Sequence, residues 1–157
     1  MDQNAVLNAA IAAFLVCTTL VICLTDFRKM IIPDWINALL AVAGATISIF
    51  AFQQHWFVVL GAAVATGLLF MALAKIYHRL RGFSGLGMGD IKFLAAASTW
   101  IGAAGLPWLL LFACVAGLIH VLVRQVAGQE VDRLTRIPFG PYLSGGLVLV
   151  WSLGLSM

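Results

Sequence analysis

The amino-acid sequence predicts an all-α membrane protein, a bundle of six transmembrane helices with both termini on the external side. Composition supports this fold class, because 63% of the 157 residues are hydrophobic and 10% are charged, against roughly 45–50% apolar and 25% charged in a soluble domain. The apolar residues also form runs of membrane-spanning length, and the basic residues fall into alternate loops. These observations exclude a separate soluble enzyme domain and leave any chemistry to the few polar residues in or beside the bilayer.

Six apolar runs, taken in order, account for the predicted helices. They cover residues 5–24, 35–52, 56–74, 91–105, 106–123 and 142–157, and all except the fourth lack Asp, Glu, Lys and Arg. No basic residue precedes the first run, so we expect it to be retained and not removed as a signal peptide. The fourth run would rise about 22 Å as a helix, less than the hydrocarbon core of roughly 30 Å. This helix therefore either begins inside the membrane boundary or includes the residues before it.

All nine Lys and Arg residues fall on one side of the membrane when six helices alternate in direction. Cytoplasmic loops are richer in Lys and Arg than external ones, so this side is predicted to be cytoplasmic. Attraction of the basic rim to anionic lipid headgroups explains the net charge of +3, so we expect the lipid bilayer, and no nucleic acid, as a partner. No internal repeat divides the chain, and residues 1–157 are predicted to form one transmembrane domain.

Metal and cofactor motifs are not apparent in the sequence. Cys17, Cys23 and Cys114 lie inside apolar runs without C-x-x-C spacing, which is typical of small packing residues. The three histidines are scattered, and no H-E-x-x-H pattern is present. We therefore expect neither a metal nor a cofactor.

Three acidic residues lie at the ends of predicted helices. Asp34 follows Pro33 at the start of the second helix, where an N-cap role accounts for it. Asp26 ends the first apolar run and Asp90 precedes the fourth. Taken singly, Asp26 could pair with the basic residues that follow it, and Asp90 could cap its helix.

Asp26 and Asp90 share the predicted cytoplasmic face, and an ionisable group at the edge of the bilayer is costly unless it is paired or hydrated. Two carboxylates that meet can divide the work of peptide hydrolysis, because the ionised one takes a proton from water while the protonated one donates to the carbonyl. The other acids, Asp2, Glu130 and Asp132, fall in a tail and a polar loop where solvation explains them. The sequence therefore predicts an aspartic protease pair.

Four glycines precede Asp90 within residues 82–89. A phosphate-binding loop is excluded, because no strand precedes this segment and no Gly-Lys-Ser/Thr follows it. Glycines beside a carboxylate do allow another backbone, such as an extended peptide, to approach closely.

Three blocks of the sequence resemble one known family. The run Gly-Met-Gly-Asp-Ile-Lys at residues 87–92 resembles the G-x-G-D signature of intramembrane aspartic proteases, and its continuation resembles that of the prepilin peptidases. Residues 26–37 resemble the family's first-aspartate segment, an Asp followed by basic residues and then Ile-Pro-Asp. Residues 137–141 resemble the Pro-Phe-Gly-Pro that opens the last helix of the family.

The resemblance implies an aspartic endopeptidase of the bacterial inner membrane with Asp26 and Asp90 as its catalytic pair and no metal or cofactor. It implies a type IV prepilin as the substrate, with a short positive leader cut at the cytoplasmic face. Supporting positions by the same resemblance are Pro33, Asp34, Asn37, Gly87, Gly89, Lys92, Pro138, Phe139, Gly140 and Pro141. The prolines could simply start the last helix, and Lys92 could extend to the interface or help keep Asp90 ionised.

Larger family members carry paired C-x-x-C motifs and methylate the new pilin N-terminus. This chain has no such motif, so it resembles the short, protease-only members of tight-adherence (Flp) pili, and we expect no methyltransferase activity. Two rival functions remain open. Carboxylates at the membrane boundary also suit a small transporter or proton relay, and helices rich in small residues also suit an inactive pilus-assembly scaffold. The sequence does not predict the oligomeric state.

Overall fold

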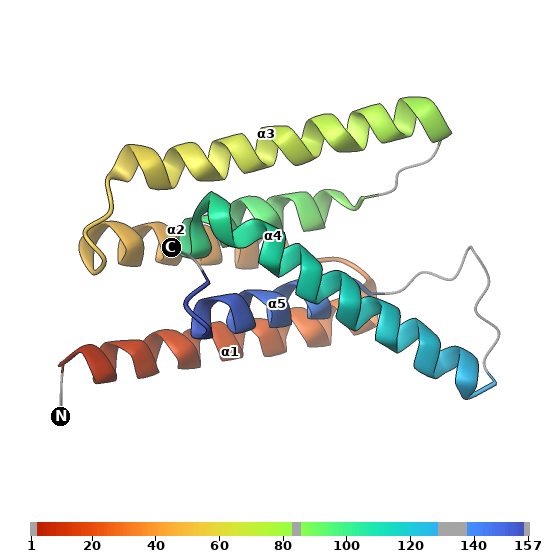
Figure 1. The fold of residues 1–157 in the computed structure, drawn as a ribbon, viewed down its shortest axis with the longest axis horizontal. Coiled ribbons are helices and arrows are strands. Elements are labelled where there is room, and N and C mark those ends of the chain that lie inside the picture. Colours follow the sequence, from red (N-terminus) through yellow and green to blue (C-terminus); the bar gives the residue numbers. More distant parts are fainter. Residues whose placement is uncertain (1–2, 83–85, 129–137, 156–157) are drawn as a thin grey trace.

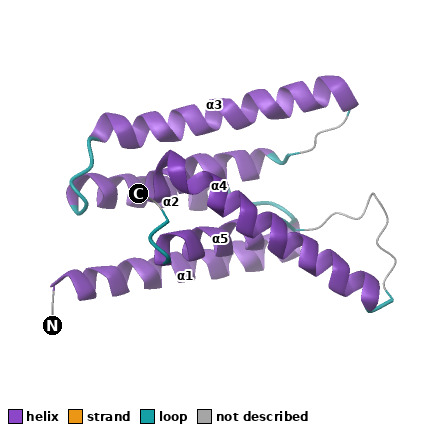
Figure 2. Cartoon of the chain, in the orientation of Figure 1, coloured by secondary structure: helices purple, strands orange, loops and turns teal. Residues whose placement is uncertain are grey.

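The computed structural model describes residues 3–82, 86–128 and 138–155, and within them it is helical apart from short connections (Figure 2). Its elements are α1 (Gln3–Lys29), α2 (Asp34–Phe50), α3 (Trp56–Arg81), α4 (Met88–Val126) and α5 (Gly140–Ser152). The predicted all-α class is confirmed, and no strand occurs in these residues. The helix over the fourth apolar run does include the residues before it, since α4 begins at Met88.

Three of the helices, α1, α3 and α4, are long and apolar enough to cross a membrane, and α2 is a shorter apolar helix of 17 residues. Many large apolar side chains point outward from them, for example Val64 at 62% and Leu68 at 63% exposure. Lipid tails are as apolar as these side chains, so an outer surface of this kind is at no disadvantage inside a bilayer. The chain is thus built as a multi-pass membrane protein.

The predicted count of six helices is not confirmed, because the fourth and fifth predicted runs form one element, α4. This element is interrupted at Gly102, whose φ of 62° and ψ of −176° are not helical. Figure 1 shows the ribbon turning back on itself there, so that α4 has a first arm (residues 88–101) and a second arm (residues 103–126). Glycine adopts positive φ at little cost, so a single residue makes the reversal that we expected between the fourth and fifth runs.

The helical segments alternate in direction along one long axis (Figure 1). The start of α1, the connection from α2 to α3 and the end of α5 lie at one end of the bundle. The end of α1, the start of α4 and the start of α5 lie at the other end. Placement of the first end on the external side stays a prediction, because it depends on the distribution of basic residues.

The first arm of α4 forms the centre of the core. It packs between the other elements, since α4 contacts α2, α3 and α5. Its buried residues include Ile91, Phe93, Leu94, Ala96, Ala97, Trp100 and Ile101. This central position fixes the start of α4, and with it Asp90, against the ends of the neighbouring helices.

Polar side chains inside the bundle bond to backbone carbonyls of the neighbouring helix. The Trp100 indole N–H donates to the carbonyl of Leu40 at 2.8 Å, and the Ser48 hydroxyl donates to the carbonyl of Thr99 at 2.7 Å. Gly44 makes this approach possible, because a Cβ there would overlap Thr99 and Trp100. A buried polar group without a partner is costly in lipid, so these bonds set the register of α2 along α4.

Candidate active site

Asp26 and Asp90 line one cavity of about 520 Å³ at the end of the bundle where α1 ends and α4 begins. Asp26 lies in the last turn of α1, and Asp90 is the third residue of α4. The rest of the lining comes from the same three blocks that the sequence singled out, namely Met30, Ile31, Ile32, Gly87, Met88, Gly89, Pro138 and Phe139. The structure therefore brings together segments that are more than 100 residues apart in the chain.

The Asp26 side chain is held by the start of α5. It is 5% exposed, and its Oδ2 accepts a hydrogen bond of 2.8 Å from the backbone N–H of Gly140. The first N–H groups of a helix have no partner within the helix, so the carboxylate of α1 satisfies one of them from outside. A Cβ at position 140 would lie 2.8 Å from the same oxygen, so only glycine leaves room for this contact.

Asp90 is not the N-cap of its helix, and that alternative is wrong. Gly87 is the N-cap, and the Asp90 carboxylate, three residues further on, lies beside the Gly87 backbone. An acid at the third helical position often reaches back to the N-cap in this way. Asp90 is half-buried, and it interacts electrostatically with Asp26.

The capping role expected for Asp34 is also wrong. Pro33 is the N-cap of α2, and no side-chain cap bond is present there. Both carboxylate oxygens of Asp34 instead lie 2.7 Å from Lys92 Nζ. Lys92 therefore neither extends freely to the interface nor pairs with Asp90, and the ion pair ties the start of α2 to the first turns of α4.

Asn37 makes a second link between α2 and the start of α4. Its side chain is 5% exposed, and Nδ2 donates to the carbonyl of Gly89 at 3.4 Å. Its Oδ1 is buried and has no hydrogen-bond partner among the described residues. The bond is long by the usual standard, so Asn37 adds little to stability and more to the placement of the residue before Asp90.

The two glycines of the signature differ in what surrounds them. A Cβ at Gly87 would lie 3.0 Å from Asp90 Oδ2, whereas one at Gly89 would make ordinary contacts of 3.5–3.7 Å with Ile32. Gly87 is therefore needed for its contact with the carboxylate. Gly89 lies against Ile32, and a Cβ would fit there, so the approach of a peptide backbone to the glycine-rich segment stays a prediction.

The four residues of the Pro-Phe-Gly-Pro block do not all lie at the same site. Pro138 and Phe139 line the cavity of the two carboxylates, and Gly140 bonds to Asp26. Pro141 lies in the first turn of α5 and lines a different, apolar cavity of about 370 Å³. Initiation of the helix accounts for Pro141, so the structure does not bring this residue to the carboxylates.

Met30 lines the cavity. It lies in the segment 26–37, but it was not among the supporting positions predicted from the sequence. It follows the end of α1 with a φ of 51°, in the left-handed region that residues other than glycine rarely adopt. Its backbone N–H donates to the carbonyl of Asp26 at 2.8 Å. A methionine gives no sign of this conformation, so local sequence patterns could not have identified it.

Among the described residues, no three His, Cys, Asp or Glu side chains form a group that could hold a metal ion. The three cysteines are free thiols. Asp2, Glu130 and Asp132 lie outside the described residues. The polar chemistry at the cavity is thus that of carboxylates, backbone amides and the neighbouring ion pair.

Comparisons with known proteins give consistent results. The chain is similar to proteins named prepilin leader peptidase/N-methyltransferase from several bacteria. It is 34% identical over 141 residues to the one from Burkholderia pseudomallei (strain 1026b), which is 88% of this chain and 45% of that protein. It is 31% identical to the one from Escherichia coli (strain K12), covering 85% of this chain and 58% of that protein.

The relative from Aeromonas salmonicida (strain A449) is 33% identical over 147 residues, which is 88% of this chain and 49% of that protein. The chain thus spans about half the length of the curated relatives it matches. No solved structure matches it. The profile of the type IV leader peptidase family matches residues 13–122, which include both cavity carboxylates. With its apolar helices, this chain is a multi-pass protein of the bacterial inner membrane, and it belongs to the type IV leader peptidase family.

Proposed function

We propose that this chain is an aspartic endopeptidase that removes the leader peptide of a type IV prepilin, with Asp26 and Asp90 as the catalytic pair. The observation that carries the proposal is the single cavity that both carboxylates line. The family match and the names of the relatives support the same activity. They favour it over the transporter and scaffold hypotheses, because the relatives are named as peptidases.

The two carboxylates can supply both proton transfers of peptide hydrolysis. One carboxylate, ionised, takes a proton from a water molecule as the water oxygen attacks the scissile carbonyl carbon. The other, protonated, donates its proton to the carbonyl oxygen. When the tetrahedral intermediate collapses, the C–N bond breaks and the first carboxyl group gives its proton to the leaving amine. The C=O bond re-forms as one hydroxyl of the intermediate returns its proton to the second carboxylate, which restores the pair. The reaction consumes one water molecule and needs no metal or cofactor.

The surroundings of the pair suit an extended peptide. The cavity lining includes Gly87 and Gly89, and the absence of a side chain at these two positions lets a peptide backbone approach the acids. The acids attract a positively charged leader, and the resemblance implies such a leader. Binding energy from the leader would then hold the scissile bond close to the acids, as catalysis by positioning requires.

Three finer features belong to the proposal. Cleavage occurs on the cytoplasmic side, which the accumulation of Lys and Arg at this end of the bundle supports. The substrate is a pilin of the tight-adherence (Flp) type, and no methyltransferase activity accompanies the cleavage. Both statements rest on the resemblance and on the absence of C-x-x-C motifs from the 157 residues.

Co-expression with a prepilin tests the proposal. Asp26→Asn and Asp90→Asn should each lower the rate of precursor shortening by at least about 100-fold, because each removes a proton-transfer group. Asp132→Asn, in the predicted polar loop, is the matched control and should process normally. Membrane extraction and circular dichroism confirm that each variant is inserted and helical. Processing that persists in both cavity variants would contradict the mechanism.

A further inference from the structure

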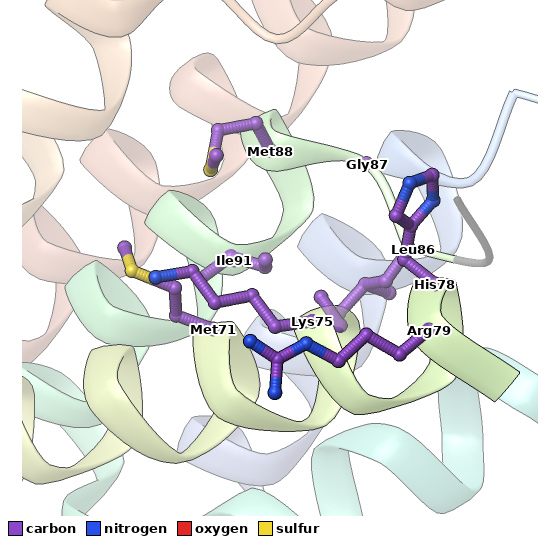
Figure 3. A pocket seen from close by; sticks show the side chains of 9 residues that line it. Met71, Lys75, His78, Arg79, Leu86, Gly87, Met88 and Ile91 are labelled. Carbon is purple, nitrogen blue, oxygen red and sulfur yellow. The ribbon is translucent and has the colours of Figure 1, made fainter. Parts of the chain in front are cut away.

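A second cavity, of about 390 Å³, adjoins the carboxylate cavity at the Gly87–Met88 segment. Both residues line both cavities. The second cavity lies between the last turns of α3 and the start of α4 (Figure 3), and its lining includes Lys75, His78, Arg79, Leu86, Met88 and Ile91. No step of the proposed cleavage uses it.

The polar part of this cavity is cationic. Lys75 and Arg79 are four residues apart on α3, so their side chains emerge on the same face of the helix. Figure 3 shows them extending in the same direction along the cavity. Within the described residues the ion pair is Lys92 with Asp34, and neither Lys75 nor Arg79 is paired with a carboxylate there. Two adjacent like charges are unfavourable, and an anion between them would remove the repulsion.

The rest of the site is apolar and continues along the membrane-spanning helix. Leu86, Met88 and Ile91 form the other wall of the cationic cavity. An adjoining groove of about 540 Å³ shares Leu86 with it and follows Leu73 and Leu80 of α3. These two side chains are exposed, at 49% and 78%. A ligand that fills both spaces must carry an anionic group at one end and a long apolar chain at the other.

We propose that an anionic phospholipid binds here, with its phosphate between Lys75 and Arg79 and an acyl chain along the groove beside Leu73 and Leu80. A lipid fits better than a substrate segment, because the groove opens on the lipid-facing side of α3 and the leader expected for the substrate is itself positive. Charge-assisted hydrogen bonds from Lys and Arg to phosphate are strong and directional. Such directional bonds distinguish a specific lipid-binding site from the diffuse attraction of basic residues to anionic headgroups.

Lipid binding should also affect catalysis, a consequence that rests on the proposed function. Gly87 and Met88 line both the lipid cavity and the carboxylate cavity, and the Gly87 backbone lies beside the Asp90 carboxylate. A lipid that orders this segment would hold Asp90 in place. Cleavage should therefore be faster in bilayers that contain the anionic lipid.

Direct binding is measured first, without reference to cleavage. The full chain is purified in detergent, mixed with phosphatidylglycerol or with phosphatidylcholine of the same acyl chains, and examined by native mass spectrometry. We expect the protein to retain phosphatidylglycerol in preference to phosphatidylcholine. In Lys75→Gln/Arg79→Gln the affinity for phosphatidylglycerol should fall by at least about tenfold. The matched control is Arg28→Gln/Arg81→Gln, which removes the same charge from the same end of the bundle and should retain the lipid.

Each other outcome overturns the lipid site. If both double variants lost phosphatidylglycerol binding equally, the lipid would be attracted only diffusely by the basic residues. If the unsubstituted protein retained the two lipids equally, it would have no site that selects the anionic lipid. Displacement of the lipid by millimolar inorganic phosphate would identify a site for free phosphate. If Lys75→Gln/Arg79→Gln changed the KM for prepilin by the same factor in both lipids, the two residues would contact the substrate and not a lipid.

Cleavage in nanodiscs then tests the coupling. With phosphatidylglycerol in place of phosphatidylcholine, the rate should rise several-fold in the unsubstituted protein and in Arg28→Gln/Arg81→Gln, and it should not rise in Lys75→Gln/Arg79→Gln. Selective lipid binding without cleavage of any prepilin would leave the lipid site standing and refute the proposed function. Cleavage of a prepilin without selective lipid binding would support the proposed function and refute the lipid site.

Discussion

Lys92 Nζ lies 2.7 Å from both carboxylate oxygens of Asp34, although the two residues are 58 positions apart in the chain. The pair joins the start of α2 to α4 two residues beyond Asp90. Both side chains are well exposed, at 73% for Asp34 and 47% for Lys92, and exposed ion pairs contribute at most about 1 kcal/mol to stability. Its main effect is therefore on the position of the start of α4, which carries Asp90, and cleavage kinetics can measure this effect.

A double-mutant cycle tests the pair. Asp34→Asn and Lys92→Gln should each slow prepilin cleavage by about two- to fivefold, the equivalent of a weak ion pair. The double variant should be no slower than either single variant, because each change removes the same interaction. Cleavage rates in purified membranes provide the measurement. Additive losses in the double variant would show that the two residues act independently.

Asn37 should matter for cleavage more than for stability. Asn37→Leu keeps the side-chain volume and removes a buried oxygen without a partner, so the melting temperature should stay the same or rise. It also removes the bond to the Gly89 carbonyl, and kcat should fall by about tenfold because Asp90 is less well placed. The measurements are thermal unfolding in detergent and cleavage kinetics.

The control for this variant is Asn8→Leu, on α1 near the other end of the bundle, which should cleave normally. A variant Asn37→Leu that melts at a lower temperature and keeps its full kcat would show that the role of Asn37 is structural only.

Gly140 should not tolerate a methyl group. In Gly140→Ala the new Cβ would lie 2.8 Å from Asp26 Oδ2, so the carboxylate has to move. A displacement of about 1 Å in a catalytic group can cost about 100-fold in rate, and we expect a loss of that order in kcat. Gly145→Ala on the same helix meets open space and should cleave at the normal rate. Equal activity of the two variants would mean that the close approach of Gly140 to Asp26 is unimportant.

Gly44 should be required for the packing of α2 on α4. A Cβ in Gly44→Ala would overlap Thr99 and Trp100, whose side chains are held by bonds to α2. Overpacking of this kind costs about 1–3 kcal/mol, and the melting temperature should fall. Gly61→Ala on α3 meets open space and is the control. Tryptophan fluorescence during thermal unfolding measures both, and a normal melting curve for Gly44→Ala would contradict the tight contact.

Local patterns were enough to predict the helices. The third apolar run was expected to begin at Trp56, and α3 begins there; the fourth helix was expected to include earlier residues, and α4 does. A run of apolar residues can satisfy its backbone in lipid only as a helix, so this information is contained in short segments. The count of six helices was not confirmed, because the reversal at Gly102 needs one residue and no loop, so the fourth and fifth runs form one element.

The sequence by itself determined the helical class, the membrane location and the short group of acids on which the proposed chemistry depends, because each follows from residue type and spacing within a few turns. Only the tertiary structure showed that Asp26 meets Gly140, at a separation of 114 residues, and that Lys92 pairs with Asp34 and not with Asp90. Such contacts depend on how the helices pack, and every charged group near the membrane edge has several partners that are compatible with its place in the sequence.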